Sequence, residues 1–272
     1  RWCAAALAPP TPPPPPTPIV GPKACQGPTA ADVCNVPAGQ CARLSGAKFC
    51  PQVSVRGGLT LQNGAKLTTG RLHVPVGGRL LVGTPQAPAS NVEINLQQTG
   101  ELVSEGEVYI HGEQKTSWTR LSQPCNWCTT ISVAQCSGWR VGDTVVLVGT
   151  GNGHNGQVEA NRDYKTDERK IRSISGCQVT LDRQAGQNHR CEKYKGRVDI
   201  CSEVLNMDRS VRIIGTAGNF ADGVRVRQQH GGAMQINYAR VSNCGQRKLG
   251  EYCLHLHKVG PCPSCSFSGN AV

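Results

Sequence analysis

The sequence predicts an almost entirely β-structured, disulfide-bonded fold, with coils of a parallel β-solenoid in its C-terminal part. Short aliphatic runs alternate with glycine turns from residue 53 onward, and each run is too short for a helix. No segment carries an apolar stripe of the helical period long enough for a major helix. Ile213, Ile236 and Leu256 hold similar places in three runs separated by 23 and 20 residues, which suits solenoid coils. An antiparallel sandwich also repeats its strands, so periodicity alone favours the solenoid only slightly.

The predicted strands are rich in Val, Ile and Leu. They lie at 53–55, 59–61, 72–76, 80–82, 92–96, 108–110, 145–148, 179–181, 211–214, 234–241 and 254–259. Hydrophobic residues make up 38% of the 272-residue chain and aromatic residues 4%, so the core must be aliphatic. This length fits one or two domains.

Fifteen cysteines indicate an oxidising compartment, because a cytosolic chain rarely keeps so many thiols reduced. The number is odd, which leaves at least one cysteine free or bonded to another chain. Residues 25–52 hold Cys25, Cys34, Cys41 and Cys50 with little apolar sequence between them, so we expect a small disulfide-rich segment. Three pairings are open, and the spacing does not choose among them.

Residues 1–24 are predicted to form an extended polyproline II linker, since residues 9–18 are almost all proline. This run resembles the hydroxyproline-rich segments of plant and green-algal wall glycoproteins. The resemblance implies O-linked sugar on hydroxylated prolines, at Pro12, Pro13, Pro14, Pro15 and Pro16. An unmodified linker is the alternative. The opening residues lack the apolar core of a signal peptide, which suggests a removed signal or a start inside a longer chain.

The formal net charge of +11 permits binding to acidic glycans. The basic residues Arg225, Arg227, Arg240, Arg247 and Lys248 are scattered and are not interleaved with aromatic residues, which argues against a nucleic-acid partner. No run of 18 apolar residues occurs, so no direct membrane span is expected in this chain.

Several motifs occur in one order over roughly 200 residues. They are Leu72 to Thr84, Val108 to Gly112, Thr116 to Leu121, Trp139 to Asp143 with Val145 to Leu147, Ser202 to Gly215, and Cys244 to Gln246 with Gly250 to Gly260. In this order they resemble the extracellular proteins that carry an eight-glycine (G-eight) domain followed by a right-handed parallel β-helix. Fibrocystin and the cell-surface hyaluronidase-like proteins belong to that group.

The resemblance implies a G-eight-like β domain at 53–195 and parallel β-helix coils at 196–272, with the last coil cut short. We expect two stacked coils at 234–241 and 254–259 whose open end is covered by further chain or by another subunit. The turns Gly57-Gly58 and Gly77-Gly78 are expected to supply positive-φ residues, and Trp139 to cap a strand turn.

His255 and His257 are the strongest candidates for chemistry, because residues two apart on a strand share one face. In the resembling family this stretch usually reads Arg-Tyr-Pro-Ile-His-Phe-His, whereas Glu251 stands here for the arginine and Cys253 for the proline. The catalytic candidates are therefore His255, His257 and Glu251. The structural alternative is a ladder in which both imidazoles hydrogen-bond to neighbouring coils.

Cys262 and Cys265 follow closely, so His255, His257, Cys262 and Cys265 supply the ligand types of a tetrahedral zinc site. Disulfides are the simpler fate of both cysteines in an oxidising compartment, and no cofactor is predicted. The second close pair, Cys125 and Cys128, lacks the context of a thioredoxin-like site and is interpreted as structural.

Glycan hydrolysis needs two carboxylates that face one bond. The candidates are Asp199, Glu203, Asp208, Asp222 and Glu251, and no spacing pairs two of them near the histidines. The predicted function is a non-enzymatic extracellular surface or matrix glycoprotein in a disulfide-linked wall, filament or ciliary-surface assembly. Its expected partners are other surface glycoproteins, acidic glycans, or copies of itself joined through β-helix ends or an unpaired cysteine. A hyaluronan-like polysaccharide depolymerase, acting as hydrolase or lyase, is the alternative.

Overall fold

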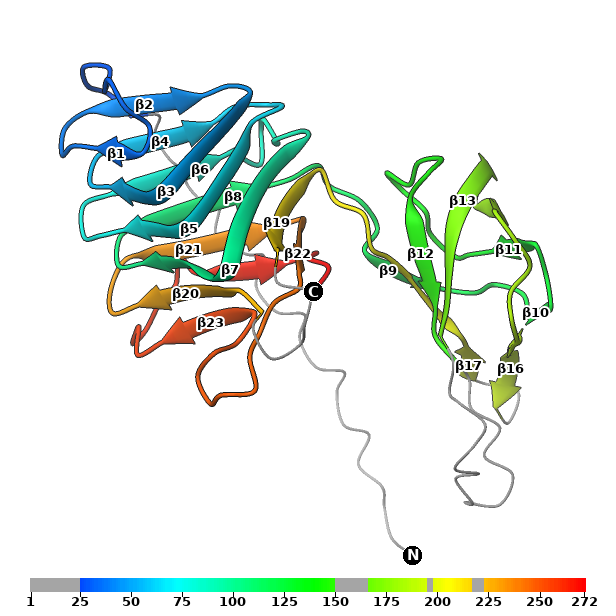
Figure 1. Ribbon diagram of the computed structural model, residues 1–272. Helices are drawn as coiled ribbons and strands as arrows, with labels where there is room; N and C mark the ends of the chain where they lie inside the picture. Colours follow the sequence, from blue (N-terminus) through cyan, green and yellow to red (C-terminus); the bar gives the residue numbers. More distant parts are fainter. Residues whose placement is uncertain (1–24, 150–165, 195–197, 217–222) are drawn as a thin grey trace, which may run out of the picture.

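The computed structural model describes residues 25–149, 166–194, 198–216 and 223–272. The predicted sites at Pro12 to Pro16 lie outside these ranges. Within them the chain forms twenty-four β-strands and no helix, which confirms the all-β prediction. Among the described residues, no helix has the length and apolar character that a membrane crossing requires. Figure 1 shows two bodies, a stack of parallel strands and a separate β-structured insert.

Two parallel sheets form the stack, and together they make a β-solenoid. The eight-stranded sheet contains β1 (Asn35–Val36), β3 (Ala47–Val55), β5 (Lys66–Val74), β7 (Val92–Ser104), β19 (Val211–Gly215), β22 (Ala239–Ser242), β20 (Arg225–Gln229) and β23 (Leu254–His257). The six-stranded parallel sheet contains β2 (Cys41–Leu44), β4 (Gly58–Leu61), β6 (Arg79–Val82), β8 (Glu107–His111), β21 (Ala233–Asn237) and β24 (Ser266–Ser268). The chain alternates between the sheets, so each coil contributes a strand to both.

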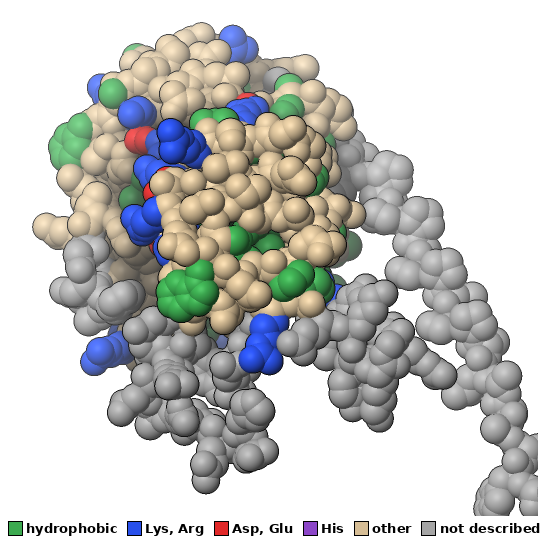
Figure 2. All heavy atoms as spheres, turned by 90° about the vertical axis from the view of Figure 1, so that its right-hand side faces the viewer, with side chains coloured by type: hydrophobic (Ala, Val, Ile, Leu, Met, Phe, Trp, Pro, Cys, Tyr) green, Lys and Arg blue, Asp and Glu red, His purple; other side chains and the backbone are tan. Residues whose placement is uncertain are grey.

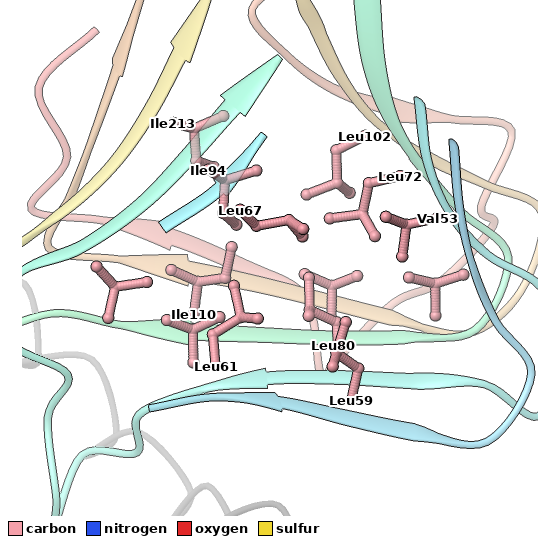
Figure 3. Close-up of a cluster of buried hydrophobic side chains, with 14 of the residues drawn as sticks. Val53, Leu59, Leu61, Leu67, Leu72, Leu80, Ile94, Leu102, Ile110 and Ile213 are labelled. Carbon is pink, nitrogen blue, oxygen red and sulfur yellow. The ribbon is translucent and has the colours of Figure 1, made fainter. Parts of the chain in front are cut away.

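The solenoid core is a column of aliphatic side chains between the two parallel sheets (Figure 3). Leu67, Leu72, Ile94 and Leu102 of the larger sheet are fully buried against the side chains of the facing sheet. Strand alternation explains the pattern, because every second residue of β5 and β7 points inward. The core is therefore aliphatic, as the composition predicts.

The spacing of 23 and 20 residues noted in the sequence is not the coil repeat. Ile213 and Leu256 lie in the larger sheet, whereas Ile236 lies in the smaller one. True neighbours are further apart, since Ile213 pairs with Val241 and Val226 pairs with Leu254, each 28 residues on. The solenoid prediction is confirmed, but the three residues do not hold equivalent places, because Ile213 and Ile236 are buried whereas Leu256 is 39% exposed. The run 234–241, expected as one coil stacked on 254–259, divides into β21 and β22, and β23 stacks on β20 instead.

An antiparallel insert interrupts the solenoid between β8 and β19. Its main sheet has the order β11 (Thr130–Ser132), β14 (Gln178–Leu181), β13 (Asp167–Ser175), β12 (Thr144–Leu147), β18 (Glu203–Asn206) and β9 (Trp118–Arg120). Two short ladders join β10 (Cys125–Asn126) to β15 (Asn188–His189) and β16 (Cys191–Tyr194) to β17 (Val198–Cys201). The insert has its own core, which includes Trp139, Val145, Leu147 and Val204.

The solenoid continues across the insert without a gap in its ladders. Val92 of β7 pairs with Val211 of β19, and Glu107 of β8 pairs with Ala233 of β21. The described chain thus re-enters the solenoid at β19, whereas the sequence suggested that the β-helix coils begin at residue 196. Residues far apart in sequence become neighbours because each sheet extends by one strand per coil.

Seven disulfides join fourteen of the fifteen cysteines. They are 25–41, 34–50, 125–128, 136–177, 191–201, 244–253 and 262–265. The first two select one of the three pairings that the sequence left open. Residues 25–52, expected as a separate disulfide-rich segment, contribute β1, β2 and part of β3 to the first solenoid coils. These bonds fit the oxidising compartment that the cysteine count indicates.

Candidate functional site

A row of alternating charges crosses the outer face of the eight-stranded sheet. Arg71 of β5 lies 3.1 Å from Glu101 of β7, and Glu101 lies 3.2 Å from Arg225 of β20. The other end of the Arg225 guanidinium pairs with Glu251. The strand register brings these groups together, since Arg71, Glu101 and Arg225 are aligned across three neighbouring strands. We call Arg71, Glu101, Arg225 and Glu251 the charged ladder.

Glu251 is held as an ionised carboxylate within this ladder. Burial raises its pKa, but the hydrogen bond and charge of Arg225, helped by Arg227 and Lys248, lower the pKa below its ordinary value. A general acid in glycan cleavage needs the opposite shift. Glu251 therefore lacks the protonation that the acid role requires at neutral pH.

His255 and His257 project from the same outer face, as their spacing predicts. Their ring centroids are 5.1 Å apart, and the Tyr252 ring lies 5.0 Å from the His255 ring. Nδ1 of His255 lies 2.9 Å from the Gly250 carbonyl oxygen, so this nitrogen carries the proton and donates it. The histidines are next to Arg227 and Gln229, with which they pair in register across β20 and β23.

Cys262 and Cys265, the remaining members of the zinc set considered from the sequence, are joined in a disulfide. A disulfide sulfur is not the thiolate that zinc binds. Among the described residues, no group of three or more His, Cys, Asp or Glu side chains is placed to hold a metal ion. Cys125 and Cys128 are bonded to each other as well.

The other carboxylate candidates do not gather around the histidines. Glu203 lies on β18 of the insert, and Asp208 accepts a hydrogen bond of 2.5 Å from the Thr144 amide where the insert joins the solenoid. Asp208 thus bonds a backbone amide, which is a structural role. The Asp199 side chain and Asp222 lie outside the described part of the molecule.

A groove of about 390 Å³ follows the turns that join the two parallel sheets. Its lining includes glycines from five successive turns, among them Gly39, Gly57, Gly78, Gly106 and Gly232. Arg79 and Glu107 line it too, with Nε and Oε2 only 2.6 Å apart. His230 lies two residues before Gly232, so the histidines are at the C-terminal continuation of the same column of turns.

Sequence reasoning missed one buried polar cluster in the insert. Nε2 of His189 is 2.8 Å from Oδ2 of Asp167, and Nδ1 is 3.1 Å from the Val148 carbonyl oxygen and 3.5 Å from Oγ of Ser202. The three residue types are those of a serine hydrolase, but His189, Asp167 and Ser202 are all buried. Ser202 also donates to the Val148 oxygen, so the cluster has the contacts of a structural network.

Basic and acidic side chains lie beside each other on the surface as well. Figure 2 shows them in one band on the side of the molecule that faces the viewer, with apolar patches elsewhere. On the outer face of the eight-stranded sheet a second row has the same character, because Glu93 pairs with Lys66 at 3.5 Å and with Arg212. These ion pairs make the outer face of the eight-stranded sheet polar.

No family model matches the chain, and no curated protein matches it. Two phage tailspike structures are similar to it in part. The tailspike gp61 of Pseudomonas phage phi297 is 16% identical with a TM-score of 0.26, over 66% of this chain and 30% of that chain. The gp54 tailspike of Acinetobacter baumannii bacteriophage AP22, in complex with A. baumannii capsular saccharide, is 13% identical with a TM-score of 0.26, over 78% and 40%. The chain thus spans less than half the length of either tailspike.

Proposed function

We propose that this chain is a non-enzymatic extracellular module, a rigid β-solenoid that forms part of a disulfide-linked surface or matrix assembly. The observation that carries the proposal is the fixation of Glu251 by Arg225 within the charged ladder. The carboxylate nearest the candidate histidines in sequence is thereby occupied in an ion pair. The surface around the histidines is suited to binding and not to proton transfer by a carboxylic acid.

The proposal includes kinship with the G-eight and parallel β-helix proteins. Two of the resembling motifs meet where the insert joins the solenoid, which supports it. Asp143, from the Trp139 to Asp143 motif, accepts a 2.8 Å hydrogen bond from Asn206 of the Ser202 to Gly215 motif. A cell-surface, wall or ciliary-surface location follows from the same kinship, and the seven disulfides support an extracellular setting.

O-linked sugar on Pro12 to Pro16 is part of the proposed glycoprotein. The chain has no Asn-x-Ser/Thr acceptor, so we expect all of its sugar to be O-linked. Native material should be heavier than the unmodified 29.0 kDa chain, and digestion should place the added mass in residues 1–24. An intact mass of the bare chain would contradict this.

The decisive test of the function is incubation with hyaluronan and other acidic polysaccharides, followed by size analysis of the polymer. We expect no shortening with the wild-type protein. Shortening that disappears in both His255→Ala and His257→Ala would establish the depolymerase instead. Shortening that persists in those variants would point to a contaminating enzyme, which repurification of the protein would remove.

A further inference from the structure

We infer that the C-terminal end of the eight-stranded sheet carries a binding site for acidic polysaccharide, built from His230, His255 and His257 with Arg227 and Lys258. We call these five residues the histidine cluster. The inference deepens the proposed function by naming the ligand class and its site. It does not require that the protein leave the polysaccharide intact.

Strand pairing assembles the cluster from two neighbouring coils. Arg227 pairs in register with His255, and the residue before His230 pairs with His257. The amide of His230 donates to the carbonyl oxygen of His257 at 3.3 Å. Arg227 lies between the buried residues Val226 and Gln228, so its side chain and that of His255 point away from the core.

His230 and Lys258 share an uncommon backbone conformation, as do five other described residues that are not glycine. His230 has φ of 55° and Lys258 has φ of 52°, so each follows its strand in the left-handed region. Residues other than glycine are uncommon in that region, although asparagine, aspartate and histidine are enriched there, so Lys258 is the more unusual of the two. Both side chains are exposed to solvent.

The electrostatic balance favours an anionic ligand. Three guanidinium groups, Arg71, Arg225 and Arg227, face two carboxylates, Glu101 and Glu251, in and beside the charged ladder. Arg225 is shared by both carboxylates, whereas Arg71 and Arg227 each pair with Glu101, at 3.1 and 3.6 Å. The Gln229 side-chain oxygen also accepts from the Arg227 guanidinium. These five charged side chains therefore carry one excess positive charge, and the exposed Lys258 beside the histidines adds another.

The histidine cluster has charged neighbours on its own two strands, on β7 and in the segment before β23. Desolvation, followed by the charges of His255, Lys258, Arg227 and His230, lowers the pKa of His257 below its ordinary value. Glu101 and Glu251 face the cluster from β7 and from the segment before β23, and Glu105 follows β7 at the adjacent turn. The partly exposed Tyr252 ring supplies an apolar face beside His255.

An acidic polysaccharide fits this chemistry better than nucleic acid does. The seven disulfides indicate an oxidising compartment, where acidic glycans are the abundant polyanions. The cluster offers a single aromatic ring and no row of stacking platforms of the kind that single-stranded nucleic acid requires. The groove along the solenoid turns reaches Gly232, two residues after His230, and could take an extended chain that continues from the cluster.

The test measures binding of the full chain to a heparin oligosaccharide, a hyaluronan oligosaccharide, a neutral dextran and a single-stranded DNA by titration calorimetry. We expect binding to an acidic oligosaccharide that weakens with salt, and none to dextran. Arg227→Gln with Lys258→Gln should weaken it roughly tenfold, from the loss of two exposed charge contacts. Arg227→Lys with Lys258→Arg keeps both charges and should retain most of the affinity.

Arg43→Gln with Lys48→Gln is the matched control, because it removes the same charge from exposed residues of the first coils. It should bind as the wild type does. The inference is overturned if the control pair weakens binding as much as the cluster pair, if neither acidic glycan binds, or if DNA binds more tightly than both. Polymer length, measured separately, reports on the proposed function alone.

Discussion

Gly78 illustrates why the solenoid turns need glycine. A Cβ atom at Gly78 would lie 1.9 Å from the carbonyl oxygen of Val55 in the preceding coil. Positive φ is expected from the sequence at Gly57-Gly58 and Gly77-Gly78, yet of these four only Gly77 has it, at 82°. Close stacking of backbone on backbone is the main requirement at Gly78.

Gly78→Ala should therefore be more damaging than an alanine at a turn that only needs positive φ. We expect a loss of about 3 kcal/mol or more in the free energy of unfolding, because the turn must move away from a backbone atom. Gly64→Ala is the comparison, since Gly64 has φ of 80° and open space around it, and should cost about 1 kcal/mol. Urea unfolding with intact disulfides measures both, and equal losses would refute the stacking argument.

The Asp167 carboxylate should make the insert sensitive to acid. Burial raises its pKa, but the hydrogen bonds from His189 and Gly186 and the charge of Arg169 outweigh burial and lower it. A pKa lower in the folded state stabilises the protein above the unfolded-state pKa of about 4, and this stabilisation disappears as pH falls through the folded value.

Asp167→Asn should accordingly lower the melting temperature at pH about 7 and have much less effect near pH 2, where both proteins lack the carboxylate charge. Melting temperatures of the two proteins across this range provide the measurement. A difference that stays constant with pH would mean that the role of Asp167 is one of shape and not of charge.

At the candidate site, the sequence located the surface that carries the histidines but did not reveal the ion pairs beside them. His255 and His257 share a face because of strand alternation, which the sequence displays directly. Glu251 appeared free because its partner Arg225 is 26 residues earlier and Arg225's other partner, Glu101, is 124 residues earlier still. Only the pairing of β7 with β20 brings these charges together.

Among the elements, the junction between insert and solenoid is held by a buried charge pair. Lys115 lies 2.8 Å from Asp143, and both side chains are almost completely buried. Asp143 also accepts from the Asn206 side chain and the Arg140 amide. Trp139, expected to cap a strand turn, is buried nearby and donates from Nε1 to the Thr116 carbonyl oxygen at 2.7 Å.

Asp143→Ala should destabilise the insert by about 3 to 5 kcal/mol, because it leaves the Lys115 ammonium buried without its partner. Adding Lys115→Met to it should restore a large part of this loss by removing the unpaired charge. Chemical unfolding of the single and double variants, followed by the fluorescence of the tryptophans, tests this. If the double variant were no more stable than the single one, the buried charge would not be the cause.

The strand elements were largely predictable, whereas the insert was not. The aliphatic runs at 53–55, 72–76 and 92–96 predict parts of β3, β5 and β7, which extend further through polar residues. The insert's strands have the same local pattern, since β12 and β14 also alternate. Local patterns do not distinguish parallel coils from an antiparallel sheet, because both bury every second residue.

For the whole molecule, the cysteine inventory makes a definite prediction. Fourteen cysteines are paired within the chain, so the odd cysteine inferred from the count is Cys3. We expect a covalent dimer on non-reducing gels that is absent in Cys3→Ser, because Cys3 has no remaining partner within the chain. Thiol labelling of the unreduced, denatured wild type should be negative. A monomer with one reactive thiol per chain would contradict this.

The insert also imposes an order on folding during synthesis. The ladder partner of Val92 is Val211, so β7 waits for roughly 120 residues of further translation before β19 emerges. At about 5 to 20 residues per second, that wait is roughly 6 to 24 s. The insert carries its three disulfides and its core within itself, so it can fold during this interval. Meanwhile β7 is paired with β5 on one side only, so its other edge is open to pairing with other nascent chains at this stage of biosynthesis.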